Sequence, residues 1–153
     1  MKQLLLVCHT PSANTQTMAQ QLLAGAQAEL TENSQVRILT PAACVAEDLL
    51  HADAVVFLTT ENLGYMAGTT KDLFDRTFYS LENTTQGLSY ALVVRAGLDG
   101  TGATRAVESI CAGLNWKPVQ ERLLCHGPWQ DEFGQQCYEL GQMMMASMDM
   151  GII

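Results

Sequence analysis

Residues 4–15 read LLLVCHTPSANT. The apolar run at the start is too short for a helix, and turn residues follow it directly, which is typical of a buried parallel strand. From Thr15 onward apolar side chains recur at helical spacing, at Met18, Leu22, Ala26 and Leu30. The segment therefore predicts a strand, a short polar loop and an amphipathic helix, in that order.

The same alternation continues along the chain. Apolar runs at 36–39, 54–58, 91–94 and about 118–125 predict further strands, and the last is expected at a sheet edge because it is more mixed in polarity. Segments of helical periodicity follow, at about 73–81, 103–114 and 133–148. There is no internal repeat, linker or low-complexity tract. We expect one α/β domain over residues 1–153, with a parallel sheet between two layers of helices.

Composition excludes several classes of function. The 153 residues are 48% hydrophobic and 16% charged, which is typical of a globular protein. Lys and Arg number 8 against 16 Asp and Glu, so the formal net charge is −8. Nucleic acid is therefore not the expected partner, because a phosphate backbone requires a basic surface. An acidic surface suits docking onto basic proteins, and it also keeps a protein in solution.

Targeting signals and metal motifs are missing from the sequence. Residues 1–7 are too short in apolar length for a secretory signal, and no stretch approaches membrane-spanning length. The five cysteines form no C-x-x-C pair, and the three histidines are widely scattered. We therefore expect a cytoplasmic protein with buried free thiols, no disulfide framework, no metal site and no membrane association.

Ligands of parallel α/β sheets bind beyond the carboxyl ends of the strands. The first such loop is rich in hydroxyl groups, has no Lys or Arg, and opens a helix. Helix N-termini offer unpaired N–H groups to an anion, although the same residue types are also ordinary helix caps. The candidate phosphate ligands are Thr10, Pro11, Ser12, Ala13, Asn14 and Thr15.

This loop lacks the motifs of three other classes of phosphate-binding protein. A low-molecular-weight tyrosine phosphatase has a nucleophilic cysteine where Cys8 stands, but needs an arginine six positions later, where this chain has Asn14. A Walker P-loop motif does not occur, and the strand end lacks the acidic residues of a receiver domain. Cys8 is therefore expected to be a core residue.

The loop at residues 10–15 resembles the phosphate-binding loop of flavodoxins, [ST]-x-T-G-N-T. Ser12 replaces the middle threonine and Ala13 replaces the glycine. If that glycine position requires a positive φ angle, Ala13 costs stability.

Residues 59–76 read TTENLGYMAGTTKDLFDR. They are similar to the T-P-x-x-x-G-x-M-x-G-x-x-K-x-F-x-D-R pattern of flavodoxin-like NAD(P)H-dependent oxidoreductases, which include the WrbA-type quinone reductases. A plain turn followed by a helix start would account for Gly64 and Gly68 alone. The resemblance implies that backbone N–H groups bind the polar edge of the FMN isoalloxazine, with Leu63 or Tyr65 near the ring. The residues implied are Thr60, Glu61, Asn62, Leu63, Gly64, Tyr65 and Met66.

The third loop follows the fourth strand, at residues 95–102. Flavodoxin-like proteins have a glycine-rich loop here that closes over the pyrimidine side of the flavin, because glycine lets the backbone approach a flat ring. We expect Arg95 at the mouth of the strand, where it would meet negative charge on the flavin or the phosphate of a nicotinamide cofactor, or else form a salt bridge with Asp99 or another carboxylate. The residues implied are Arg95, Ala96, Gly97, Asp99 and Gly100.

The resemblance covers nearly the whole chain and implies a flavodoxin-like three-layer α-β-α sandwich, with a five-stranded parallel sheet of order 2-1-3-4-5. It implies FMN as cofactor and NAD(P)H as the expected electron donor, with a quinone or similar acceptor. No catalytic acid or base is assigned, because the flavin carries the chemistry. The alternative is a flavodoxin in the strict sense, a one-electron carrier between redox proteins. WrbA-type relatives are oligomeric, so a homo-oligomer is compatible with the resemblance.

Overall fold

Three strands that are buried on both faces form the centre of the molecule. In the computed structural model, which describes residues 1–153, these are β1 (Lys2–Cys8), β3 (Ala54–Asn62) and β5 (Ser89–Ala96). Most residues of the three strands have less than a tenth of their surface exposed, and the exceptions lie at or next to the strand ends. Burial on both faces explains why the strands are continuous apolar runs rather than alternating ones.

The sheet has the connectivity that the resemblance implies. Its order is β2-β1-β3-β5-β6, with β7 also paired to β5, and these pairs are all parallel. Only β4 pairs antiparallel, in a hairpin with β3. The additional strands are β2 (Ser34–Leu39), β4 (Tyr65–Met66), β6 (Lys117–Pro118) and β7 (Leu123–His126). The predicted order 2-1-3-4-5 is confirmed, with β6 and β7 together in the fifth place.

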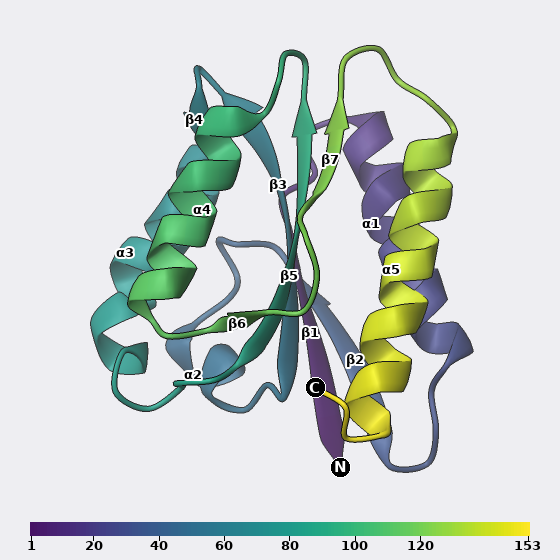
Figure 1. Cartoon of the computed structure of the whole chain (residues 1–153), viewed down its shortest axis with the longest axis vertical. Helices are drawn as coiled ribbons and strands as arrows, with labels where there is room; N and C mark the ends of the chain where they lie inside the picture. The colour runs from purple at the N-terminus through teal and green to yellow at the C-terminus, as the bar shows by residue number, and fades with distance from the viewer.

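Helices cover both faces of the sheet (Figure 1). One face carries α1 (Ala13–Ala28) and α5 (Glu132–Asp149). The other carries α2 (Ala46–Leu50), α3 (Gly68–Leu81) and α4 (Thr101–Gly113). None of these helices combines the length and apolar character that crossing a bilayer requires.

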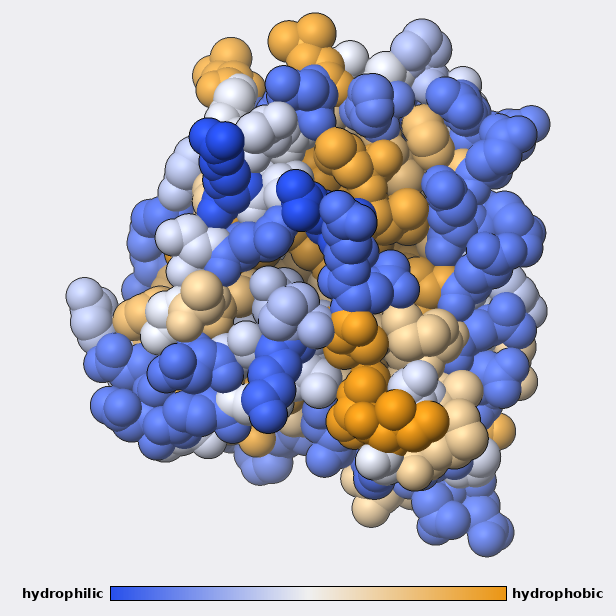
Figure 2. Space-filling model, viewed as in Figure 1, coloured by the Kyte–Doolittle hydropathy of each residue, from blue (hydrophilic) through white to orange (hydrophobic).

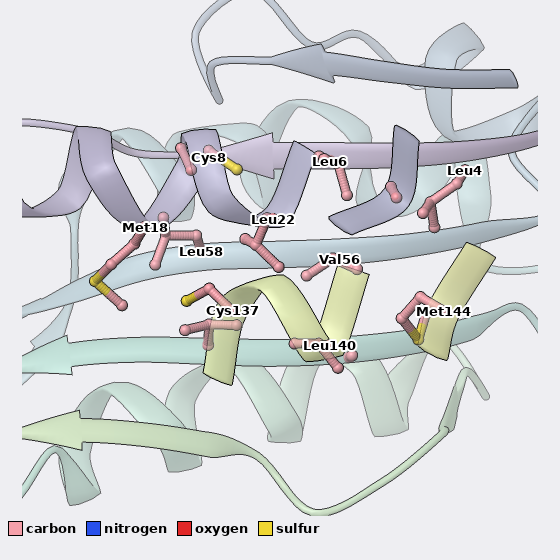
Figure 3. Packing of buried hydrophobic residues seen from close by; sticks show 14 of the residues in the cluster. Leu4, Leu6, Cys8, Met18, Leu22, Val56, Leu58, Cys137, Leu140 and Met144 are labelled. Atoms are coloured by element: carbon pink, nitrogen blue, oxygen red, sulfur yellow. The ribbon is translucent and has the colours of Figure 1, made fainter. Parts of the chain in front are cut away.

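The core between the sheet and the pair α1 and α5 is shown in Figure 3. Side chains such as Met18 and Leu22 of α1 and Met144 of α5 pack onto Leu6 and Val56 of the sheet, and all five are fully buried. Burying a side chain of this size stabilises the fold by about 1.5–3 kcal/mol. The helical spacing in the sequence correctly identified the inner faces of these two helices, except at Leu30, which lies beyond the end of α1 and is exposed.

Glycines allow α1 and α5 to approach unusually closely. A Cβ atom at Gly25 would overlap the carbonyl oxygen of Tyr138, and one at Gly141 would overlap that of Leu22. The backbones of the two helices are therefore in contact without an intervening side chain at these positions.

Three local features differ from the expectation. The fifth strand is interrupted between β6 and β7, where residues 119–122 are not part of the sheet. These residues are mostly polar, and the preceding Pro118 has no N–H group to donate to a neighbouring strand. β3 runs on to Asn62 rather than ending near residue 58, and turns into the β4 hairpin. The helix α2 was not expected, because one turn and a half is too short to show periodicity.

The close contact of α1 and α5 makes a prediction. Gly141→Ala should lower the free energy of unfolding by about 1–3 kcal/mol, because its methyl group must push the helices apart. Gly134→Ala, also on α5, is the matched control: the nearest atom is Gln21 Cγ at 3.6 Å. That variant should be neutral or more stable by up to about 1 kcal/mol, because alanine favours helix. Chemical denaturation measures both, and equal effects would contradict the account.

Candidate functional site

The carboxyl ends of β1, β3 and β5 meet at one edge of the sheet, at the top of Figure 1. Because neighbouring strands lie about 4.8 Å apart, the ends of β1 and β5 are separated by about 10 Å. The three loops singled out in the sequence leave the sheet here. The fold thus brings the predicted site residues to one edge.

The first loop ends in a helix cap. The Ser12 hydroxyl accepts from the Thr15 backbone N–H (3.2 Å), and the Thr15 hydroxyl accepts from the Ser12 backbone N–H (3.0 Å). Ala13 and Asn14 are the next residues of the first turn, where helical geometry provides no intrahelical acceptor for a backbone N–H. No acidic residue lies in this turn. The loop is therefore both a capped helix start and a place with free donors for an anion.

Ala13 fits its position without strain. Leu63 and Asn115 are the only residues other than glycine with a positive φ, and Ala13 begins α1 in ordinary helical conformation. Ala13 therefore does not lower the stability of the fold, because the backbone here does not need the left-handed conformation that favours glycine.

The second loop is a tight hairpin between β3 and β4. Its two central residues, Leu63 and Gly64, have φ angles of 53° and 76°, which is the pattern of a type I′ turn. Leu63 is fully exposed at the tip, and a bulky residue with positive φ is strained. The β3 side of the hairpin is held by the Thr60 hydroxyl, which donates a hydrogen bond to Asn62 Oδ1 (2.8 Å).

The hairpin docks against the start of α4. The backbone N–H of Ala103 donates to Glu61 Oε2 (3.1 Å), so this carboxylate caps the helix N-terminus. A Cβ atom on Gly102 would overlap the carbonyl oxygen of Gly64, so the two backbones touch. Gly102 is a residue that the sequence-based list of site residues missed. Its presence in the glycine-rich run 97–102 was the only local signal for it.

The third loop is held in shape by its own residues. Gly100 has a φ of 71°, and any side chain there would overlap Leu124. Asp99 Oδ1 accepts from the Thr101 backbone N–H (3.0 Å), and hydrogen bonding to Thr101 lowers the pKa of this carboxyl. Gly97 has open space around it. This loop and the hairpin therefore share α4 as a common support.

Arg95 is not free at the mouth of the strand, and it does not pair with Asp99. Its Nη1 donates to the carbonyl oxygens of Ala96 (2.8 Å) and Cys125 (3.0 Å). Its guanidinium lies 5.9 Å and 5.3 Å from the ring centres of Trp129 and Phe133. Alternation along β5 turns Arg95 to the face covered by α5, so it ties that helix to the sheet.

Cys8 is a core residue, as expected. It is buried at the end of β1, and burial raises the pKa of its thiol to about 12. It is therefore neutral near pH 7 and unsuited to nucleophilic chemistry. The neighbouring His9 is half-buried, which lowers its pKa, and its Nδ1 lies 3.2 Å from the Thr69 hydroxyl. This contact links the first loop to the start of α3.

Neither a family model nor a curated protein sequence matches the chain significantly. Solved structures do match it. A flavodoxin from the domain Archaea has a TM-score of 0.79 at 19% identity, covering 97% of this chain and 99% of that one. The chain has the flavodoxin-like fold.

Two further structures show how this flavodoxin-like fold recurs. A flavodoxin, WrbA-like protein from Agrobacterium tumefaciens has a TM-score of 0.73 at 14% identity, covering 98% of this chain and 99% of that chain. The flavodiiron protein from Giardia intestinalis has a TM-score of 0.79 at 15% identity and covers 99% of this chain. This chain matches only 37% of that flavodiiron protein. At such identities the similarity establishes the fold alone.

The contact between the hairpin and α4 makes the second prediction. Gly102→Ala should lower the free energy of unfolding by about 1–3 kcal/mol, because the new methyl group must displace the Gly64 carbonyl. Gly97→Ala is the control in the same loop, where nothing lies within 4 Å and no change is expected. Thermal or urea unfolding measures both. An unaffected Gly102→Ala would show that the hairpin does not rest on α4.

Proposed function

We propose that residues 1–153 form one flavin-binding domain that holds FMN at the carboxyl edge of the sheet and transfers electrons. The observation that carries this is the start of α1, where Ala13 and Asn14 have free N–H groups and no acidic residue lies in the first turn. That turn lies at the same edge as the hairpin of residues 60–66. A phosphate and a flat ring therefore have neighbouring places to bind.

The charges around the edge suit an anionic cofactor. Two of the predicted site residues, Glu61 and Asp99, carry carboxylates, and both accept hydrogen bonds from the first turn of α4. Their charge is thereby compensated by N–H groups and by the helix dipole. Glu61 and Asp99 therefore orient the loops. We assign the phosphate of FMN to the start of α1, where no carboxylate occupies the free N–H groups.

Bound FMN supplies a ring that accepts and releases one or two electrons. In this proposal Thr10 and Ser12 hold the phosphate together with the free backbone N–H groups. Thr15 is buried and shapes the loop, because its hydroxyl donates to the Ser12 carbonyl oxygen (3.0 Å). The hairpin and residues 96–100 hold the ring from two sides and exclude water from it. The chain needs no acid or base of its own.

A carrier between redox proteins is the role that we favour. Arg95, the cation expected to meet a nicotinamide cofactor, is engaged by backbone carbonyls and aromatic rings. Leu63 and Leu98 are exposed at the two loops that flank the site, and Figure 2 shows hydrophobic residues at these tips. Exposed apolar residues on a surface of net charge −8 suit a protein partner with a basic rim.

Transfer from NAD(P)H to a quinone is the second candidate. The pattern of residues 59–76 favours it, because it is similar to that of flavodoxin-like NAD(P)H-dependent oxidoreductases. The similar structure from Agrobacterium tumefaciens is named both a flavodoxin and WrbA-like, so it is compatible with either candidate.

The third prediction concerns the phosphate. Asn14→Asp should weaken FMN binding about tenfold or more, because it adds a negative charge beside the phosphate. The same change should leave the fold intact or slightly more stable, because an acidic residue favours a helix N-terminus by about 0.3–1 kcal/mol. Fluorescence quenching measures FMN affinity.

Riboflavin lacks the phosphate, so its affinity should not change in Asn14→Asp. Gln20→Glu makes the same change of charge farther along α1 and should retain FMN affinity. Equal FMN affinity in Asn14→Asp and the unaltered protein would rule out this phosphate site.

The fourth prediction separates the two roles. A carrier mixed anaerobically with NADPH or NADH should keep its oxidised flavin absorption over many minutes, and dithionite should reduce it in two resolved one-electron steps. Rapid bleaching by either nucleotide would make the oxidoreductase role correct. Absence of any flavin absorption after FMN loading would contradict both.

A further inference from the structure

The sheet ends in two edge strands that differ in how they are protected. One edge is interrupted between β6 and β7, and it carries Pro118 and the charged residues Glu121 and Arg122. Interruptions, prolines and charges of this kind keep other strands from pairing with an edge. At the other edge, β2 is a regular strand of six residues without proline. Its one charge, on Arg37, is compensated by Asp48 of α2 at 2.9 Å. β2 is therefore open to pairing with another strand.

The free backbone groups of β2 follow from its pairing with β1. Parallel strands bond through every second residue of each strand. The backbone N–H of Lys2 donates to the Asn33 carbonyl (2.8 Å), so residues 33, 35, 37 and 39 bond to β1. The N–H and C=O groups of Val36 and Ile38 therefore point away from the sheet, and no loop or helix supplies a hydrogen-bond partner for them.

Beside this edge, α1 and β2 enclose a groove of about 350 Å³. Ala19 and Leu23 of α1 and Ile38 of β2 line it, together with Gln16 and Gln20. Ile38 has 38% of its surface exposed. The amide groups of the two glutamines each offer donors and an acceptor, so they can bond to a copy of themselves. The flank formed by α1 and β2 thus presents apolar and neutral polar side chains.

This flank is free of carboxylates in a chain of net charge −8. Residues 3–28 contain no Asp, Glu, Lys or Arg, and Glu29 and Glu32 are the only carboxylates in residues 1–46. Glu29 is turned toward α5, where it accepts from Gln142 Nε2 (3.3 Å). Two copies of an acidic chain repel each other, and the repulsion is smallest where they meet through an uncharged surface. A basic protein, by contrast, would find no carboxylate on the flank to pair with.

We propose that this flank is an interface between two copies of the chain, in which the two β2 strands pair antiparallel about a two-fold axis at Val36. Residues whose backbone groups point outward then form the hydrogen-bonded pairs, Val36 with Val36 and Ser34 with Ile38 of the second copy. Gln35 lies opposite Arg37 of the second copy, so no like charges face each other. An axis at Arg37 would instead place two arginines opposite one another.

The proposed interface lies on the far side of β1 from the hairpin and from residues 96–100, because the sheet order is β2-β1-β3-β5. The groove shares only Thr10 with the proposed phosphate loop. Dimerisation can be measured without FMN, so its outcome does not depend on flavin binding.

Sedimentation equilibrium of the whole chain, at concentrations up to about 0.5 mM, should show a reversible monomer–dimer equilibrium, since small interfaces form weak complexes. In ¹H–¹⁵N NMR spectra, rising protein concentration should shift the amides of Val36 and Ile38 and slow their exchange with solvent. Added salt should favour the dimer, because it screens the repulsion between two acidic chains.

Ile38→Lys should weaken dimerisation about tenfold or more, because an apolar contact is lost and a charge is placed at the edge. Tyr79→Lys makes the same change of charge at an exposed position of α3, on the other face of the sheet, and should dimerise normally. Ile38→Pro removes an N–H group that has no partner in the single chain, and it should prevent dimerisation as well.

NMR dispersion checks that each variant is folded. The proposal is overturned if the unaltered chain is monomeric at every concentration, if the concentration-dependent shifts map to β6 and β7, or if folded Ile38→Lys or Ile38→Pro dimerises as well as the unaltered chain.

Discussion

Burial of β1, β3 and β5 on both faces is the constraint on which the rest of the structure depends. Strands without a solvent face must be covered by helices on each side, and each crossover must then pass from one strand end to the next. The first, second and third candidate loops thereby emerge at one edge, within about 10 Å of each other. The proposed site lies at that edge because the chain turns there.

The start of α4 is the second organising element. The backbone N–H groups of Ala103 and Thr101 donate to the carboxylates of Glu61 and Asp99. Between them, Gly102 has no side chain and leaves room for the carbonyl group of Gly64. Two loops that are far apart in the sequence are thus fixed against one helix terminus. In the proposed function, this support would hold the flat flavin ring between the two loops.

Much of this could be predicted from the sequence, because continuous apolar runs and helical periodicity are local signals. The position of the three loops followed from these signals, and the strand order followed from the resemblance. The environment of Arg95 could not be predicted, since it depends on which face of β5 it occupies and on Trp129 and Phe133 from another element. The contact of Gly102 with Gly64 is likewise between distant segments. The interruption at residues 119–122 could not be predicted either, because the mixed polarity of residues 118–125 is compatible with one continuous edge strand.

In the proposed function, the three loops at the carboxyl edge hold FMN. The most direct measurement is a ¹H–¹⁵N NMR titration of the cofactor-free chain with FMN. If FMN binds there, the largest amide shifts fall in residues 10–15, 60–66 and 96–100, with little change around β6. Shifts elsewhere, or none with an excess of FMN, would contradict it.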